Sequence, residues 1–191
     1  MTTDLRPGPD QPPADELAGA EAAWAVLEQV LSRIGGDEWS NPTPCSEFDV
    51  AQLTEHLLHS ITILGGAAGA EFPARDAADS VAGQVSSAAR PALDAWRGRG
   101  LDGTVAFGPT ELPAKTAAGI LALEFLVHAW DYATATGRTL NAAEPLVGYV
   151  LDLAHTIITP EGRVRAGFDD PVDVPDSASS LHRLIAFTGR S

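Results

Sequence analysis

Apolar residues recur every three or four positions over several long stretches of the chain, which is the period of an amphipathic α-helix. The first stretch covers residues 14–34 and the second covers residues 50–64, and a pair of glycines follows each of them. Asp49 precedes the second stretch and Gln52 comes three residues later, which is the spacing of a capping box at a helix start. We therefore expect two amphipathic helices in the first part of the chain.

The helical period returns further along the chain. Residues 75–97 are alanine-rich and weakly amphipathic, and Pro91 within them predicts a kink or a division because proline lacks the backbone N–H. A fourth helix is expected to start at Pro113, which suits a first turn, and to stop at Gly137. A fifth covers residues 144–159. Five helices are thus predicted before the C-terminal segment.

Short extended segments are expected in two places. Residues 101–112 predict two short strands that turn at Gly108 and Pro109. The segment 163–191 begins with loop or short extended pieces and closes on a short helix, SSLHRLIAFTG. Since long antiparallel helices joined by moderate loops make up most of the chain, the pattern predicts a mainly α, up-and-down bundle.

The length of 191 residues suits one domain with a full hydrophobic core and is short for two domains. Residues 1–13 are rich in proline and polar residues, so we expect a disordered N-terminal segment there. A single domain is expected over residues 14–191, with no internal repeat or low-complexity tract.

The charge of the chain limits its partners. Twenty-six Asp and Glu residues against twelve Lys and Arg give a net charge of −14, which would repel a phosphate backbone, so we expect no nucleic-acid partner. No uncharged apolar stretch approaches the about 18 residues of a membrane span, and the first residues do not resemble a signal peptide, so we expect no membrane partner. The single cysteine, Cys45, cannot form an internal disulfide, which suits a cytoplasmic location.

Candidate chemistry lies in LEFLVHAWDYATATG, residues 123–137. Glu124 and His128 are four residues apart, which places them on one face of a helix, and Asp131 follows three residues later along the same edge. The rest of the first ten residues is apolar or small, which indicates burial. Because burying an unpaired carboxylate is costly, this face needs cations, hydrogen bonds or a metal to compensate the charge.

A divalent cation would satisfy that requirement. Among the nearby cationic side chains, Lys115 lies more than two turns away and Arg138 lies beyond the end of the predicted helix. The second predicted helix offers two histidines, His56 and His59, which lie roughly 60° apart around its axis. One histidine with the Glu-x-x-x-His pair gives two imidazoles and one carboxylate, a ligand set of catalytic zinc sites that leaves a fourth position open.

Each of these residues also has a structural interpretation. Glu124 and His128 have the spacing of a solvated, hydrogen-bonded i,i+4 pair. His56 or His59, taken singly, suits a half-buried core or surface histidine. Cys45 lies in a proline-rich turn and no spacing pairs it with a base, which favours a structural thiol over a nucleophile.

Three segments taken together carry a family resemblance: WSNPTPCSEFDVAQLTEHLLHS, LEFLVHAWDYATATG and the closing SSLHRLIAFTGR, with an FG-containing hairpin between the first two. The chain resembles the actinobacterial proteins related to the metal-binding N-terminal domain of mycothiol-dependent maleylpyruvate isomerase, within the DinB-like superfamily. The resemblance covers nearly the whole chain after residue 14. It implies a DinB-like four-helix bundle with a small β-hairpin and a short C-terminal helix.

The resemblance also implies a divalent metal, usually zinc or nickel, held by one histidine of the second helix and two residues four apart on a later helix. By position, the metal ligands here would be His56, Glu124 and His128. Asp131 would orient a ligand or the bound water, and it is the residue we predict as catalytic. His59 falls outside the family pattern.

The activity implied by the resemblance is that of a metal-dependent enzyme of the S-transferase or isomerase type, which uses a low-molecular-weight thiol such as mycothiol against a small electrophile. The isomerase itself has an additional C-terminal domain, so its own reaction is not carried over. One alternative is a hydrolase in which Asp131 is the base. Another is a non-catalytic metal-binding or small-molecule-binding bundle, forming a homodimer through apolar helix faces, with a fourth ligand such as His59 closing the site.

Overall fold

The computed structural model describes residues 10–45, 47–166 and 168–190. Most of the predicted N-terminal disordered segment, residues 1–9, therefore lies outside the described residues. The mainly α fold class is confirmed. The elements are α1 (Glu16–Leu31), the short 3-10 helix η1 (Gly36–Glu38), α2 (Val50–Ala67), α3 (Val81–Arg99), β1 (Thr104–Phe107), β2 (Thr110–Pro113), α4 (Ala114–Ala135), α5 (Glu144–Ile157), α6 (Pro160–Ala166) and α7 (Ser180–Phe187).

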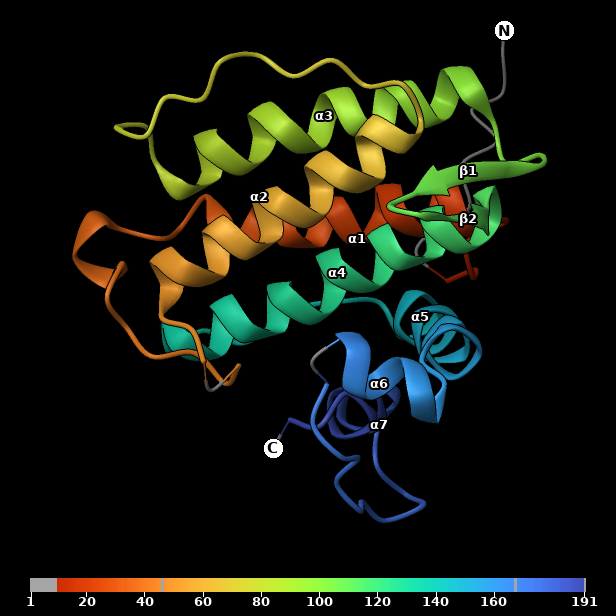
Figure 1. Cartoon of the computed structure of the whole chain (residues 1–191). Helices are drawn as coiled ribbons and strands as arrows, with labels where there is room; N and C mark the ends of the chain where they lie inside the picture. Colours follow the sequence, from red (N-terminus) through yellow and green to blue (C-terminus); the bar gives the residue numbers. More distant parts are fainter. Residues whose placement is uncertain (1–9, 46, 167, 191) are drawn as a thin grey trace, which may run out of the picture.

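Helices α1 to α4 form the four-helix bundle (Figure 1). Helix α1 packs against α3 and α4, and α2 packs against the same two helices, so α1 and α2 occupy opposite corners. The core between them is continuous and apolar, with Trp24 of α1 against Phe125 of α4 at a ring-centroid distance of 5.5 Å. The buried apolar faces are those that the sequence period predicts.

The directions of the helices do not alternate strictly along the chain. Arg75, in the connection between α2 and α3, pairs with Glu55 near the start of α2 and with Gln84 near the start of α3. The two helices therefore run in the same direction, because the connection of residues 68–80 returns along the length of the bundle (Figure 1). The apolar period indicates which face of a helix is buried. It does not indicate whether two successive helices run in the same or in opposite directions.

Local signals set several of the helix boundaries. The side chain of Asp49 accepts a hydrogen bond from the backbone N–H of Gln52 at 2.8 Å, and the Gln52 side chain accepts one from the Asp49 N–H at 3.0 Å. The predicted capping box is thus confirmed. Gly137 has φ of +65°, the left-handed conformation that suits the residue after a helix end, as predicted for α4. Pro113 lies at the N-cap of α4, one position before the predicted first turn.

Two details of the helices differ from the expectations. Helix α3 runs through Pro91 without the division that was one of two expected outcomes, because its buried alanine, leucine and tryptophan face offsets the lost backbone bond. Helix α6 follows the expected end of the fifth helix at residue 159 and extends into the segment from residue 163, which was expected to begin with loop or short extended pieces. Its start has local chemistry rather than an apolar period: Pro160 is its first residue, and Thr159 accepts a hydrogen bond from the Gly162 N–H at 3.0 Å.

The adjacent glycines at the end of α2 make a matched pair for testing the packing of the bundle. A Cβ at Gly65 would lie 2.6 Å from Cβ of Ala92 and 3.1 Å from its Cα, whereas a Cβ at Gly66 would meet nothing within 4 Å. We expect Gly65→Ala to lower the free energy of unfolding by about 1–3 kcal/mol through overpacking. Gly66→Ala should raise it by about 0.5–1 kcal/mol, since alanine is the better helix former. Urea unfolding measures both, and changes of the same sign would contradict the packing of α2 on α3.

Helices α5, α6 and α7 gather on one side of α4 (Figure 1). Helix α5 packs against α4, and α7 packs against α5. The predicted hairpin is confirmed, with β1 and β2 antiparallel and Phe107 opposite Thr110. The packing of α5 on α4 and of α7 on α5 brings the C-terminal segment beside the helix that carries the predicted site.

Within the described residues, no helix combines the length and the apolarity needed to cross a bilayer.

Candidate metal centre

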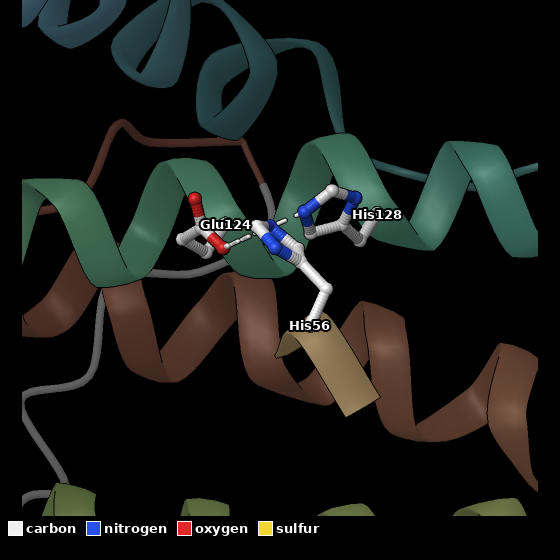
Figure 2. Close-up of side chains that lie close together, drawn as sticks. All are labelled: His56, Glu124 and His128. Carbon is white, nitrogen blue, oxygen red and sulfur yellow. Dashed lines mark ion pairs between the residues drawn. The ribbon is translucent and has the colours of Figure 1, made fainter. Parts of the chain in front are cut away.

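The antiparallel contact of α2 with α4 brings the predicted ligands together (Figure 2). His56 points from α2 toward the Glu124 and His128 side chains of α4. The His56 Nε2 atom lies 3.6 Å from Glu124 Oε2, and the His128 Nε2 atom lies 3.5 Å from the same oxygen. One candidate ligand atom from each residue lies within 4.8 Å of the others. The spacing predicted from the sequence thus corresponds to a compact cluster in space.

The cluster is closed on the side of the bundle core and open on the side of His56. The side chain of His128 is 6 % exposed and that of Glu124 is 15 % exposed, whereas that of His56 is 36 % exposed. The His56 ring stacks on Phe48 at a centroid distance of 5.3 Å and meets His128 edge-on at 5.2 Å. These contacts fix the orientation of His56 at the mouth of the site.

Glu124 has a carboxylate oxygen that the protein leaves unsatisfied. Its Oε2 is buried and has no hydrogen-bond partner among the described residues. The two imidazole nitrogens face it at distances longer than a normal hydrogen bond. A buried carboxylate oxygen without a partner is destabilising. Two imidazoles and one carboxylate at these positions fit a divalent cation, which would supply the missing partner.

The titration of the cluster reflects its burial and mutual charges. Burial raises the pKa of Glu124, but the neighbouring His128 and His56 outweigh burial, so the pKa is lower than its usual value. The carboxyl group is therefore ionised at neutral pH. Burial lowers the pKa of His128, but hydrogen bonding to Asp131 and the proximity of Glu124 outweigh it and raise the pKa to about 9. Burial lowers the pKa of His56. In the metal-free protein, His128 therefore holds a proton that a cation would have to displace.

Asp131 lies behind His128, away from the point where the three candidate ligands meet. The His128 Nδ1–H donates a hydrogen bond to Asp131 Oδ2 at 2.9 Å, which directs Nε2 of the same ring toward Glu124. Asp131 itself is completely buried. The aspartate therefore orients a candidate ligand, which is a common arrangement around metal-binding histidines.

Arg190 compensates the charge of Asp131, a role that the sequence analysis missed. Its Nε donates to Asp131 Oδ1 at 2.8 Å, its Nη2 donates to Oδ2 at 3.0 Å, and its Nη1 donates to the carbonyl oxygen of Thr188 at 3.2 Å. Of the two cationic side chains near this helix in the sequence, Lys115 and Arg138, Arg138 pairs instead with Glu38 at 2.7 Å. The need for a metal therefore rests on Glu124 and not on Asp131. The signal for Arg190 was present in the closing TGR motif.

A cavity of about 630 Å³ opens beside the cluster. His56, Glu124 and His128 lie on its wall, and Arg190 also borders it. Cys45 lines the same cavity, and burial raises the pKa of its thiol despite the nearby Arg190. The protonated thiol suits the structural role expected for this residue.

His59 does not join the cluster. Its side chain is exposed, and no fourth His, Cys, Asp or Glu belongs to the group within the described ranges 10–45, 47–166 and 168–190. We expect His59→Ala to leave the stoichiometry and affinity of divalent-metal binding unchanged, because the side chain is exposed and does not belong to the cluster. Competition with a chelating dye measures both quantities. A loss of tenfold or more in affinity would make His59 a ligand and contradict the cluster.

The sequence matches a known protein family. Residues 20–133 match the family described as mycothiol maleylpyruvate isomerase N-terminal domain. The chain is also similar to an uncharacterized protein of Mycobacterium tuberculosis strain H37Rv, with 29 % identity over 180 residues that cover 93 % of this chain and 98 % of the relative. An uncharacterized protein of M. tuberculosis strain CDC 1551 has the same identity and coverage. No solved structure matches the chain.

The matched segment contains all three residues of the cluster, together with Asp131. The closing segment that carries Arg190 lies outside it. With well over half of its length matched, the chain belongs to the family of the mycothiol maleylpyruvate isomerase N-terminal domain.

Proposed function

We propose that this protein is a metal-dependent enzyme that transfers a low-molecular-weight thiol, such as mycothiol, to a small electrophile. In this proposal His56, Glu124 and His128 hold one divalent cation, either zinc or nickel. The observation that carries it is the buried Glu124 oxygen, which faces two imidazole nitrogens and has no hydrogen-bond partner among the described residues. Membership of a family described by its link to mycothiol supports the choice of thiol.

The chemistry follows from an open site with three protein ligands. A bound divalent cation favours the thiolate form of a thiol at neutral pH. The thiol loses its proton to water, its sulfur forms a bond to the electrophilic carbon, and the leaving group departs with the electron pair of the bond that breaks. In a reaction of the isomerase type, the thiol adds to the substrate and is later expelled. The cavity at the open side of the cluster provides room for these reactants.

The residues around the cluster have positioning roles in this scheme. Asp131 holds His128 by the ring nitrogen that faces away from Glu124, and Arg190 holds Asp131. The mouth of the site is formed by His56, whose orientation Phe48 fixes by stacking. Asp131 is thus better described as a positioning residue than as the catalytic group expected from the sequence.

The contacts of Asp131 favour thiol transfer over metal-dependent hydrolysis. A hydrolase of this kind needs a base that reaches the attacking water, and Asp131 was the candidate. Both of its oxygens are bonded to Arg190 or His128, and its side chain is completely buried. It has no free oxygen directed toward the cavity.

The test combines metal removal with product analysis. We expect conjugation of mycothiol to 1-chloro-2,4-dinitrobenzene to be lost after treatment with a chelator and restored by zinc. Replacing His56 by Ala should abolish the restored activity, since the ligand at the mouth of the site is gone. Liquid chromatography of the products, with and without thiol, separates conjugation from hydrolysis. Conjugation at the rate of the uncatalysed reaction in zinc-loaded protein would refute the proposal.

A further inference from the structure

Two kinds of side chain line the cavity beside the cluster. The polar ones are the three candidate ligands together with Ser60, Thr116, Cys45, Glu47 and Arg190. The apolar ones, here called the apolar wall, come mainly from the hairpin, α4, the end of α5 and the segment after α6. Its main side chains are Phe107, Leu112, Ile120, Ile157, Ile158 and Phe168. A ligand in this cavity would have one end near the cluster and the rest against hydrocarbon.

Away from the cluster, the side chains that border the cavity offer no free cation to an anionic ligand. Among the described lining residues, Glu47 and Glu124 are acidic and Arg190 is the one with a permanent positive charge. The Nε and Nη2 atoms of Arg190 are bonded to Asp131, and its Nη1 is bonded to a carbonyl oxygen. Its charge therefore neutralises a buried carboxylate of the protein. The net charge of −14 adds a field that repels anions.

We propose that this cavity selects a neutral, largely apolar small molecule as the electrophile, and that it discriminates against carboxylated or sulfonated analogues of the same shape. The proposal rests on the proposed function for the identity of the reacting end, which would lie near the cluster. The volume of about 630 Å³ is that of a site for a drug-sized ligand. Apolar contact is favourable along the wall of Phe107, Ile120 and Phe168, whereas an anionic group there would be buried without a partner.

Two fluorescent probes with one skeleton test the discrimination directly. N-phenyl-1-naphthylamine is neutral, and 8-anilino-1-naphthalenesulfonate is the same molecule with one sulfonate added. Titration of the full-length, metal-free protein, in which no bound cation can pair with the sulfonate, should give one site for the neutral probe, with a dissociation constant at least tenfold lower than that of the sulfonate. Equal or tighter binding of the sulfonate, or no binding of the neutral probe, would overturn the proposal.

Variants locate the probe in the cavity. Ile120→Lys places a cation on the apolar wall. It should weaken binding of the neutral probe at least tenfold, and it should narrow or reverse the difference in affinity between the neutral probe and the sulfonate. Val172→Lys is the matched control, because Val172 is an exposed apolar side chain away from the cavity lining, and it should change neither constant. Phe107→Lys on the hairpin repeats the test without altering a helix, should Ile120→Lys fail to fold. If the lining variant and the control variant lose equal affinity for the neutral probe, the probe binds outside the cavity and the proposal is wrong.

Zinc binding, measured on the same samples, keeps this inference separate from the proposed function. If the protein binds zinc but not the neutral probe, the inference about the cavity is wrong and the metal-dependent function is unaffected. If the protein binds no zinc but binds the neutral probe, and Ile120→Lys loses that binding, the proposed function is wrong and the inference about the ligand class of the cavity holds.

Discussion

Replacing His128 by Ala is expected to lower the affinity for zinc by more than about 100-fold. Loss of a residue that merely orients a ligand costs about 10–100-fold, and His128 is itself a proposed ligand. Its Nε2 faces Glu124 Oε2 at 3.5 Å, and its ring is almost completely buried, so the variant loses one of two imidazole ligands. Competition titration against a chelating dye measures the change.

His155→Ala is a suitable control, because His155 packs edge-on against Phe187 at a centroid distance of 4.5 Å and does not belong to the cluster. The control should bind zinc as tightly as the wild type. Circular dichroism of both variants establishes that the helices are intact. Wild-type affinity in a folded His128→Ala variant would remove this histidine from the site.

The second large effect concerns the ion pair behind the site. Arg190→Met is expected to lower the free energy of unfolding by about 3–5 kcal/mol, because it removes the guanidinium from the buried Asp131 carboxylate and leaves only His128 beside it. Replacing both residues, Asp131→Asn with Arg190→Met, should recover much of the loss, since the buried carboxylate is then gone. Urea unfolding of the metal-free proteins measures these differences without a contribution from bound ions.

The same pair gives a pH dependence with a definite sign. Burial raises the pKa of Asp131, but the hydrogen bond from His128 and the charge of Arg190 outweigh it and hold the pKa below its usual value. The stability that this depressed pKa contributes is present above the unfolded pKa of about 3.9 and is lost as the pH falls through the lower folded value. The difference in the free energy of unfolding between the wild type and Arg190→Met should therefore narrow as the pH falls below about 4. A difference that is constant from pH 7 to pH 3 would show that the variant loses packing and not a charge interaction.

The sequence was most informative where function depends on spacing within one helix. Glu124 and His128 are four residues apart, so any regular helix places them together. The choice of His56 over His59 followed from the family resemblance, and the structure agrees because the packing of α2 on α4 turns His56 toward the pair and leaves His59 exposed. An amphipathic pattern alone did not separate two histidines that lie near one another on a helix.

The sequence was least informative where contacts join distant segments. Arg190 meets Asp131 across 59 positions of the chain, and no local period connects the two. Helix α6 was missed because it is only seven residues long, too short to show an apolar repeat. The shared direction of α2 and α3 depends on the path of residues 68–80, which sequence composition does not specify. These three features arise from tertiary packing.

In the proposed site, His56, Glu124 and His128 hold a single divalent ion with one position open to an incoming thiol. X-ray absorption at the zinc edge, on zinc-loaded protein before and after addition of mycothiol, reports these ligands. We expect nitrogen and oxygen ligands at about 2.0–2.2 Å with the signature of two imidazoles, and one sulfur at about 2.3 Å that appears only with the thiol. A sulfur ligand already present before the thiol is added, which Cys45 would have to supply, would contradict this ligand set, and so would a spectrum without imidazole.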